Sequence, residues 1–152
     1  MKTVVVSGGF DPVHIGHIEL MKAAKALGDR LIVILNNDSW LKKKKGFVFM
    51  NESERKAVLE AFKYVDRVLV TSHPDDPTDM SICRELELLK PDIFANGGDR
   101  DKKDADNRAS SLNPEQELCA KLGIKMIFGV GGKKQQSSSE LVRRANETGY
   151  VA

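Results

Sequence analysis

The stretch GGFDPVHIGH, residues 8–17, follows a short run of valines and combines glycines with two histidines. The two leading glycines let the backbone turn and approach a ligand closely, and Pro12 stiffens the loop. A helix that starts near Gly16 directs its unpaired N–H groups back towards this loop. His14 and His17 are three positions apart, so both imidazoles project from one side of the first helical turn. The stretch therefore predicts a strand, a turn and a helix that together bind an anion.

The rest of the chain alternates short β-branched runs with helical patterns. We expect strands at residues 2–7, 30–36, 67–71, 92–95 and 125–128, and helices at 17–27, 51–65, 80–89, 114–122 and 137–146. Five strands separated by helices predict an α/β fold in which a five-stranded parallel sheet lies between two layers of helices. Ligands of such folds bind beyond the C-terminal ends of the strands, where the polar stretches of this chain fall. We expect a single domain over residues 1–152.

Composition limits the classes of protein. The chain has 152 residues, of which 41% are hydrophobic and 30% charged, which is typical of a globular protein. A formal charge of +2 gives no reason to expect a nucleic-acid partner. The apolar stretches are too short to cross a membrane, and no signal peptide is apparent, so we expect a cytoplasmic protein. Cys83 and Cys119 form no CxxC pair and are expected to be buried apolar side chains.

The residues of the 8–17 stretch favour phosphate as the anion. Neither GxGxxG nor GxxxxGK[ST] is present, so the two commonest phosphate-binding loops are excluded. Asp11 cannot attract an anion, and we expect it to meet a magnesium ion that accompanies a triphosphate, or to orient a histidine. Zinc bound by Asp11, His14 and His17 is a weaker alternative, because the third histidine, His73, lies in another loop without cysteines. Simple helix capping by the histidines is a further alternative.

The segment His14-Ile15-Gly16-His17 resembles the HxGH signature of the nucleotidyltransferase superfamily, in its cytidylyltransferase-like branch. The enzymes that the chain most resembles are the glycerol-3-phosphate cytidylyltransferases and the heptose-phosphate nucleotidyltransferases. The resemblance implies a Rossmann-like three-layer sandwich. It implies His14, His17, Lys44 and Lys45 as catalytic residues, and Gly8, Gly9, Phe10, Asp11, Gly16, Arg55, Gly97, Gly98, Asp99, Ser137, Ser138 and Ser139 as nucleotide-binding residues, with Asp11 as a metal contact beside the triphosphate.

Two basic segments extend the resemblance. The run WLKKKKG, residues 40–46, stands where the family carries a basic loop that is flexible until phosphates bind. Lys44 and Lys45 are slightly favoured over their neighbours as phosphate contacts, and a solvated lysine-rich loop is the alternative. Arg55 matches an arginine that either holds the site together or contacts the ligand. Lys63 stands where the glycerol-phosphate enzymes often have arginine, which puts a bidentate contact there in doubt.

Two glycine-containing turns complete the pattern. KPDIFANGGDR, residues 90–100, resembles the GGD turn of the heptose-phosphate enzymes, in which Gly97 and Gly98 approach the base or ribose while Asp99 and Arg100 supply polar contacts. An ordinary turn after a strand is the alternative. GGKKQQSSSELVRR, residues 131–144, places three serines before a helix, where the family has a phosphate-binding SST or STT motif. Ordinary capping needs only one serine.

These parts define a reaction class. No Ser-His-Asp set, activated cysteine or carboxylate pair is visible, so no covalent intermediate is expected. A phosphate nucleophile needs only alignment with the α-phosphorus and charge neutralisation. We expect transfer of CMP from CTP to a phosphorylated sugar or polyol, with Mg²⁺, release of pyrophosphate and a homodimeric enzyme. The alternatives are adenylyl transfer from ATP, of the heptose-1-phosphate or nicotinate-mononucleotide type, and a nucleotide-binding module without turnover.

Overall fold

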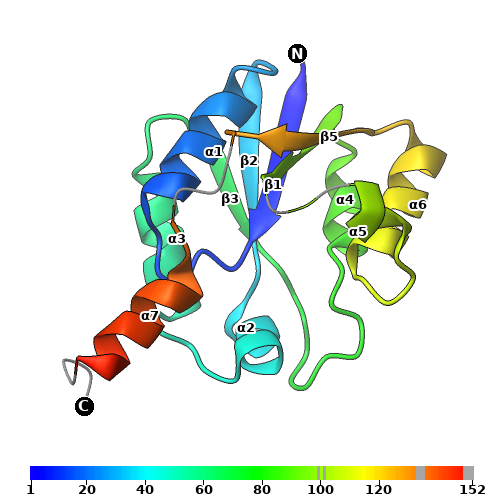
Figure 1. Ribbon diagram of the computed structural model, residues 1–152. Coiled ribbons are helices and arrows are strands. Elements are labelled where there is room, and N and C mark those ends of the chain that lie inside the picture. Colours follow the sequence, from blue (N-terminus) through cyan, green and yellow to red (C-terminus); the bar gives the residue numbers. More distant parts are fainter. Residues whose placement is uncertain (99, 101, 133–135, 149–152) are drawn as a thin grey trace.

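The computed structural model describes residues 1–98, 100, 102–132 and 136–148 (Figure 1). The elements follow in the order β1 (Thr3–Gly8), α1 (Ile15–Lys25), β2 (Arg30–Leu35), α2 (Asp38–Lys45), α3 (Glu52–Glu60), β3 (Arg67–Val70), α4 (Cys83–Leu89), β4 (Ile93–Gly97), α5 (Lys102–Asp106), α6 (Leu112–Leu122), β5 (Lys125–Val130) and α7 (Ser138–Glu147). The five predicted strands are all present, each within about two residues of its expected bounds, which is the usual uncertainty of such boundaries.

The sheet is parallel throughout, with the strand order β3-β2-β1-β4-β5. The chain builds one half outward from β1 through β2 to β3, and then crosses over to add β4 and β5 on the other side of β1. The order therefore reverses between β1 and β4. In an open parallel sheet a crevice forms at this position, beyond the carboxyl ends of the strands.

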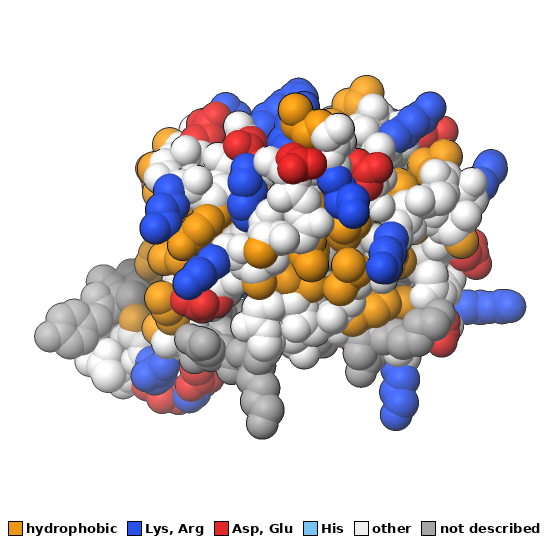
Figure 2. Space-filling model, turned by 90° about the horizontal axis from the view of Figure 1, so that it is seen from above, with side chains coloured by type: hydrophobic (Ala, Val, Ile, Leu, Met, Phe, Trp, Pro, Cys, Tyr) orange, Lys and Arg blue, Asp and Glu red, His pale blue; other side chains and the backbone are white. Residues whose placement is uncertain are grey.

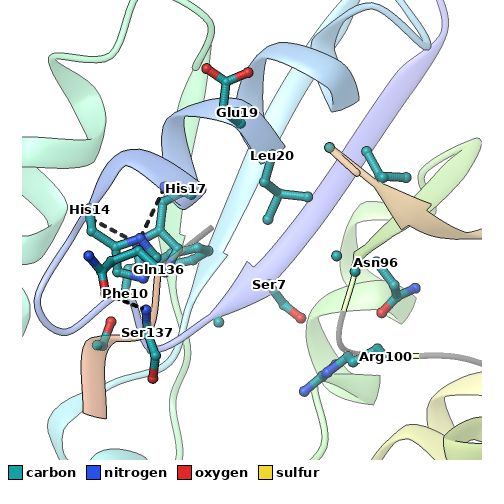
Figure 3. Close-up of a pocket in the computed structure, with 18 of the residues that line it drawn as sticks. Ser7, Phe10, His14, His17, Glu19, Leu20, Asn96, Arg100, Gln136 and Ser137 are labelled. Carbon is teal, nitrogen blue, oxygen red and sulfur yellow. Dashed lines mark hydrogen bonds between the residues drawn. The ribbon is translucent and has the colours of Figure 1, made fainter. Parts of the chain in front are cut away.

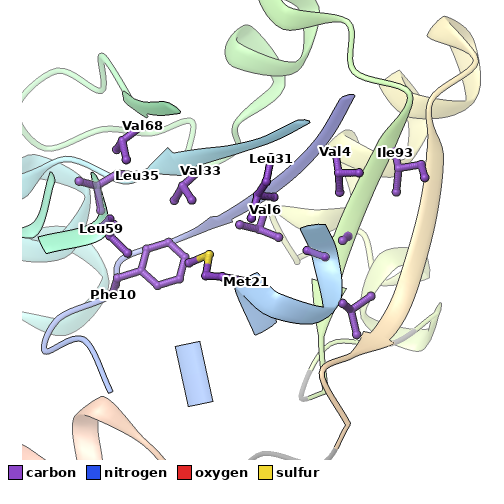
Figure 4. Packing of buried hydrophobic residues seen from close by; sticks show 13 residues of the cluster. Val4, Val6, Phe10, Met21, Leu31, Val33, Leu35, Leu59, Val68 and Ile93 are labelled. Carbon is purple, nitrogen blue, oxygen red and sulfur yellow. The ribbon is translucent and has the colours of Figure 1, made fainter. Parts of the chain in front are cut away.

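Helices cover both faces of the sheet, which confirms the predicted Rossmann-like three-layer α/β fold. In Figure 1, α1 and α3 lie on one side of the sheet and α4, α5 and α6 on the other. The two-residue period of β1 divides its valines between two cores. Val4 and Val6 pack with Met21 of α1 and Leu59 of α3 (Figure 4), whereas Val5 packs in the second core with residues of α4 and α6. All three valines are fully buried, as expected of a central strand.

The lysine-rich segment differs from its prediction, because it forms helix α2 and not a loop. Asn37 caps the helix, its side-chain oxygen accepting a hydrogen bond from the amide of Trp40 at 3.0 Å. Gly46 ends the helix with a φ of +85°. Trp40 and Leu41 anchor one side of the helix in the interior. The lysines occupy the last turn, where the helix dipole favours positive charge.

Two further segments differ from the sequence expectations. Helix α3 ends at Glu60 and not at residue 65, because the chain tightens into a turn in which the amide of Phe62 donates to the carbonyl of Leu59 at 3.1 Å. The side chains of Phe62 and Val65 then pack on the first core from this turn. Between β4 and the helix expected at 114–122, where no element was expected, the chain forms the short helix α5, whose Ala105 is buried in the second core.

The surface and the cysteines agree with the composition. Figure 2 shows Lys and Arg side chains interspersed with Asp and Glu on the face seen from above. In the part of the chain that the structure describes, no helix is both long and apolar enough to span a membrane. Cys119 is buried as expected, Cys83 is half-buried, and both are free thiols. Burial raises the pKa of the Cys119 thiol to about 12.

Candidate active site

A cavity of about 330 Å³ opens at the carboxyl ends of β1 and β4, where the strand order reverses. It brings together most of the site residues expected from the sequence (Figure 3). Those that line it are Gly8, Gly9, Phe10, His14, Gly16, His17, Lys45, Gly97, Gly98, Ser137, Ser138 and Ser139. Asp11, Lys44 and Arg55 do not line it, and Asp99 lies outside the described residues.

His14 and His17 form the start of α1 through a reciprocal pair of hydrogen bonds. Nδ1 of His14 accepts from the amide of Gly16, and Nδ1 of His17 accepts from the amide of His14, both at 3.1 Å. An acceptor nitrogen carries no proton, so in each neutral ring the proton resides on Nε2. The rings stack with centroids 3.7 Å apart. Capping and ligand binding are therefore compatible, because capping uses only Nδ1 of each ring.

Two neighbours keep these imidazoles in place. A Cβ on Gly16 would come within 3.0 Å of Cε1 of His14, so the close approach of the ring requires glycine. Phe10 is buried in the first core beside Met21 (Figure 4) and presents its ring to His17 in an edge-on contact at 4.8 Å. The backbone of Phe10 has a φ of +49°, which is uncommon outside glycine. The apolar core thus fixes the position of the second histidine.

The N-termini of two helices meet at the cavity. Helix α1 begins there with Ile15, and α7 begins there with Ser138. Ser137 caps α7 by accepting from the amide of Glu140 at 3.3 Å, while the hydroxyl of Ser138 donates to the carbonyl of Pro12 at 2.7 Å. This second bond ties the two helix starts together. Two helix N-termini with their amides and hydroxyls form a favourable environment for a polyanion.

Only part of the lysine run belongs to the site. Lys45, at the end of α2, lines the cavity and is half-buried, whereas Lys44 is exposed and does not line the cavity. Lys43 pairs with Asp76 at 2.6 Å. The neighbouring Trp40 also lines the cavity and donates from its indole to the carbonyl of Met80 at 2.9 Å. Because consecutive residues of a helix point in different directions, the lysines of α2 cannot all face the cavity, and Lys45 is the one of the four that lines it.

The Asp11 side chain is bonded to the protein backbone and does not line the cavity. It is 2% exposed, and its two carboxylate oxygens accept from the amides of Phe49 and Met50, each at 2.6 Å. These bonds fix the segment that leads into α3. Among the described residues, no group of three or more His, Cys, Asp or Glu side chains is arranged to hold a metal ion. The described part of the site thus does not fit a metal held by the protein.

Arg55 lies behind the cavity wall, and its environment fits the supporting role that the sequence left open. Its side chain is fully buried. The guanidinium donates to the carbonyls of Gly9 and Asn36 at 2.7 Å and of Met50 at 2.8 Å, and forms a 2.7 Å ion pair with Asp38. It therefore joins the loop after β1, the end of β2 and the start of α2. A charge that is buried and satisfied in this way holds the backbone of the site together.

The turn after β4 supplies the far side of the cavity. Asn96, Gly97, Gly98 and Arg100 all line it. Behind Arg100 lies Glu115 of α6, which is 2% exposed and whose Oε1 is 4.0 Å from Nη1 of Arg100. Burial raises the pKa of Glu115 to about 7, against the opposing effect of Arg100.

Sequence reasoning gave no role to four side chains that shape the site, namely Trp40, Asn96, Glu115 and Gln136. Two of them stood inside quoted motifs, because Trp40 begins the WLKKKKG segment and Asn96 precedes the glycine pair. Gln136 stands directly before the three serines. No local signal marks Glu115, which looks like an ordinary helix residue until the fold brings it behind the β4 turn.

Comparisons with known proteins agree with this geometry. A family model described as cytidylyltransferase-like matches residues 5–145. The FAD synthase of Pyrococcus abyssi is 46% identical over 99 residues, which cover 64% of each chain. The bifunctional protein HldE of Campylobacter jejuni subsp. doylei is 42% identical over 100 residues, covering 64% of this chain and 20% of that protein. The match thus spans less than two thirds of the FAD synthase and one fifth of HldE.

Solved structures show the same fold. The lipopolysaccharide core biosynthesis protein of Thermoplasma volcanium superposes with a TM-score of 0.63 at 29% identity, covering 85% of this chain and 94% of that chain. The pantoate-beta-alanine ligase of Francisella tularensis gives a TM-score of 0.61 at 15% identity, covering 99% of this chain and 70% of that one, and so shows likeness of fold alone. The HxGH segment, the reversal of strand order at the cavity and the match over residues 5–145 agree, and the chain belongs to the cytidylyltransferase-like family.

Proposed function

We propose that this protein is an adenylyltransferase, which transfers AMP from ATP to a phosphorylated acceptor and releases pyrophosphate. The proposal rests on one observation above all, the placement of His14 and His17 at the start of α1, with Nε2 as their proton-bearing nitrogen, beside the start of α7. The names of the relatives support ATP as the donor and flavin mononucleotide, FMN, as the acceptor.

The transfer step needs alignment and charge stabilisation. An oxygen of the acceptor phosphate attacks the α-phosphorus of ATP, a new P–O bond forms, and the bond to the β-phosphate bridging oxygen breaks. Pyrophosphate leaves with that electron pair. The two Nε2–H groups donate to the α- and β-phosphate oxygens, the start of α7 binds the terminal phosphates, and Lys45 adds a positive charge. A phosphate nucleophile is already an anion, so no general base is required.

The donor expected from the sequence was CTP, and the comparisons favour the alternative, ATP. Arg55, which the resemblance to the cytidylyltransferases offered as a possible ligand contact, is fully buried and bonded to the protein backbone, so its presence does not bear on the base. FAD contains an AMP unit joined to FMN. ADP-heptose likewise contains an AMP unit, joined to heptose phosphate. Ala95, Gly97, Val130 and Gly131 contribute small or apolar groups to the cavity lining at the ends of β4 and β5, and we propose that the adenine ring packs against them.

A second acceptor has its own support. The turn before Asp99 resembles that of the heptose-phosphate enzymes, and HldE is a relative at 42% identity. Heptose 1-phosphate is therefore the alternative acceptor, and both candidates present a phosphate monoester as the nucleophile.

The test is a matrix of donors and acceptors. ATP, CTP, GTP and UTP are each incubated with FMN, heptose 1-phosphate, glycerol 3-phosphate or nicotinate mononucleotide and Mg²⁺, with pyrophosphate release followed and products identified by mass. We expect ATP with FMN to give FAD and one pyrophosphate per product. Riboflavin, which lacks the phosphate, is the matched control and is expected to give none. If product forms with CTP but not with ATP, the assignment of ATP as the donor is contradicted. If no pair releases pyrophosphate, nucleotidyl transfer itself is contradicted.

A further inference from the structure

Arg100 holds a distinctive position in the cavity. Among the described residues of the lining, two carry a permanent positive charge, Lys45 and Arg100. Figure 3 shows Arg100 and Asn96 on one side of the cavity and His14, His17 and Ser137 on the other, with Ser7 between the two groups. The Arg100 side chain is 34% exposed, so the cavity reaches it without leaving it fully solvated. The family resemblance gave it only an unspecified polar contact with the nucleotide.

Glu115 supports this arginine from behind. Its Oε2 accepts from the amide of Ile82 at 2.9 Å, which fixes the carboxylate between α4 and α6. Its Oε1 is buried and, within the described part of the chain, has no hydrogen-bond partner, while Nη1 of Arg100 lies 4.0 Å away. Burying a carboxylate with one unsatisfied oxygen costs free energy, and an arginine nearby is the feature that offsets it. A guanidinium has five N–H donors, so contact with one carboxylate leaves donors for an anion in the cavity.

The geometry of the reaction assigns a ligand to the other donors. In phosphoryl-type transfer the attacking and leaving oxygens lie roughly in line on opposite sides of the phosphorus. The starts of α1 and α7 hold the leaving pyrophosphate in the proposed function, so the nucleophile approaches from the opposite side of the cavity. That side carries Arg100, whose planar fork suits bidentate binding of a phosphate.

We propose that Arg100 binds the phosphate of the acceptor and that Glu115 is its positioning residue. The inference rests on the proposed function, since it requires a phosphorylated acceptor. It extends that function by separating the two substrates, with the triphosphate held by the histidine and serine side and the acceptor phosphate by the β4 side. Glu115 acts only through Arg100, because its carboxylate is buried and does not line the cavity.

The direct test is binding of each substrate alone, measured by calorimetry with FMN and with ATP. In Arg100→Gln the loss of a charge-assisted contact is expected to weaken FMN binding by about tenfold or more, while ATP binding changes by less than about threefold. Arg100→Lys keeps the charge but lacks the planar guanidinium. Its affinity for FMN is expected to lie between those of the wild type and Arg100→Gln. Arg108→Gln removes an exposed arginine that does not line the cavity, and is the control.

Glu115→Gln tests the positioning role. The amide keeps an acceptor for Ile82 but removes the charge beside Arg100. At pH 8, above the pKa of about 7 of Glu115, the KM for FMN is therefore expected to rise about three- to tenfold, with kcat and the KM for ATP near wild type. A residue needed only for folding would lower the melting temperature without selecting between substrates. Glu117→Gln, at an exposed position of the same helix, is the control.

The outcomes separate the two proposals. An active wild type whose Arg100→Gln variant binds FMN normally, or loses ATP affinity at least as much as FMN affinity, overturns the inference and leaves the proposed function standing. For a wild type that releases pyrophosphate with heptose 1-phosphate but not FMN, weaker binding of heptose 1-phosphate by Arg100→Gln supports the inference, and unchanged binding overturns it. A wild type inactive with every acceptor removes both proposals.

Discussion

Replacing Gly16 by alanine is expected to impair catalysis while leaving the fold intact. The new Cβ would lie 3.0 Å from Cε1 and 3.1 Å from Nδ1 of His14. Carbon atoms in ordinary contact are about 3.5 to 4.0 Å apart, so the ring must retreat by roughly 0.5 Å or rotate. Either movement weakens the hydrogen bond from the Gly16 amide to Nδ1, which orients the imidazole. Because a displacement of about 1 Å at a catalytic group can cost about 100-fold, we expect kcat to fall about 10- to 30-fold.

The stability of the same variant should change little. Loss of the cap lowers the free energy of unfolding by about 1 kcal/mol. Alanine in place of glycine at a helical position raises it by up to about 1 kcal/mol. The assay is pyrophosphate release at saturating ATP and FMN, paired with thermal melting. Ile15→Ala, at an exposed position in the same turn, is the control and should retain activity. A Gly16→Ala protein that melts normally and turns over like wild type would show that the position of His14 does not matter.

Three further changes test other parts of the site. Lys45→Ala should lower kcat/KM about tenfold or more in the pyrophosphate assay, whereas Lys44→Ala should not, because only Lys45 lines the cavity; equal losses would restore the idea of a diffuse basic loop. Arg55→Met should lower the free energy of unfolding by about 3 to 5 kcal/mol in urea titrations, since it leaves buried carbonyls and Asp38 unpaired; a stable variant with weakened ATP binding would instead indicate a ligand contact. The folded-state pKa of Glu115, about 7, lies above its usual 4.5, so folding binds a proton and stability falls as pH rises from about 4.5 to beyond 7. Glu115→Gln should therefore gain up to about 3 kcal/mol relative to wild type between pH 4.5 and 8 in urea titrations, and a pH-independent difference would contradict the burial effect.

Much of the fold was predictable because local patterns determine it. The β-branched runs mark the strands, and the spacing of His14 and His17 is itself the geometry of a helical turn. Helix α2 was missed because four consecutive lysines obscure its apolar side, and the burial of Trp40 and Leu41, which stabilises it, depends on contacts with the rest of the chain.

Long-range contacts explain the rest. Arginine is rarely fully buried, and Arg55 becomes so because the fold brings carbonyls from the loop after β1 and the end of β2 to its guanidinium. Glu115 acquires its environment from Ile82 and Arg100, which are distant in sequence. Gly97 and Gly98 were expected to approach the base or ribose, and side-chain identity alone does not specify which base the backbone there accepts.

The most direct measurement of the central claim is the rate of pyrophosphate release by His17→Ala relative to wild type, at saturating ATP and FMN. The Nε2–H of His17 is proposed to stabilise charge that develops on the transferred phosphate, and removing such a donor costs about 100-fold or more. Circular dichroism and melting of the same sample establish that the variant is folded. The predicted result is a folded His17→Ala protein whose turnover is about 100-fold or more below wild type; a folded variant with near-normal turnover would contradict the central claim.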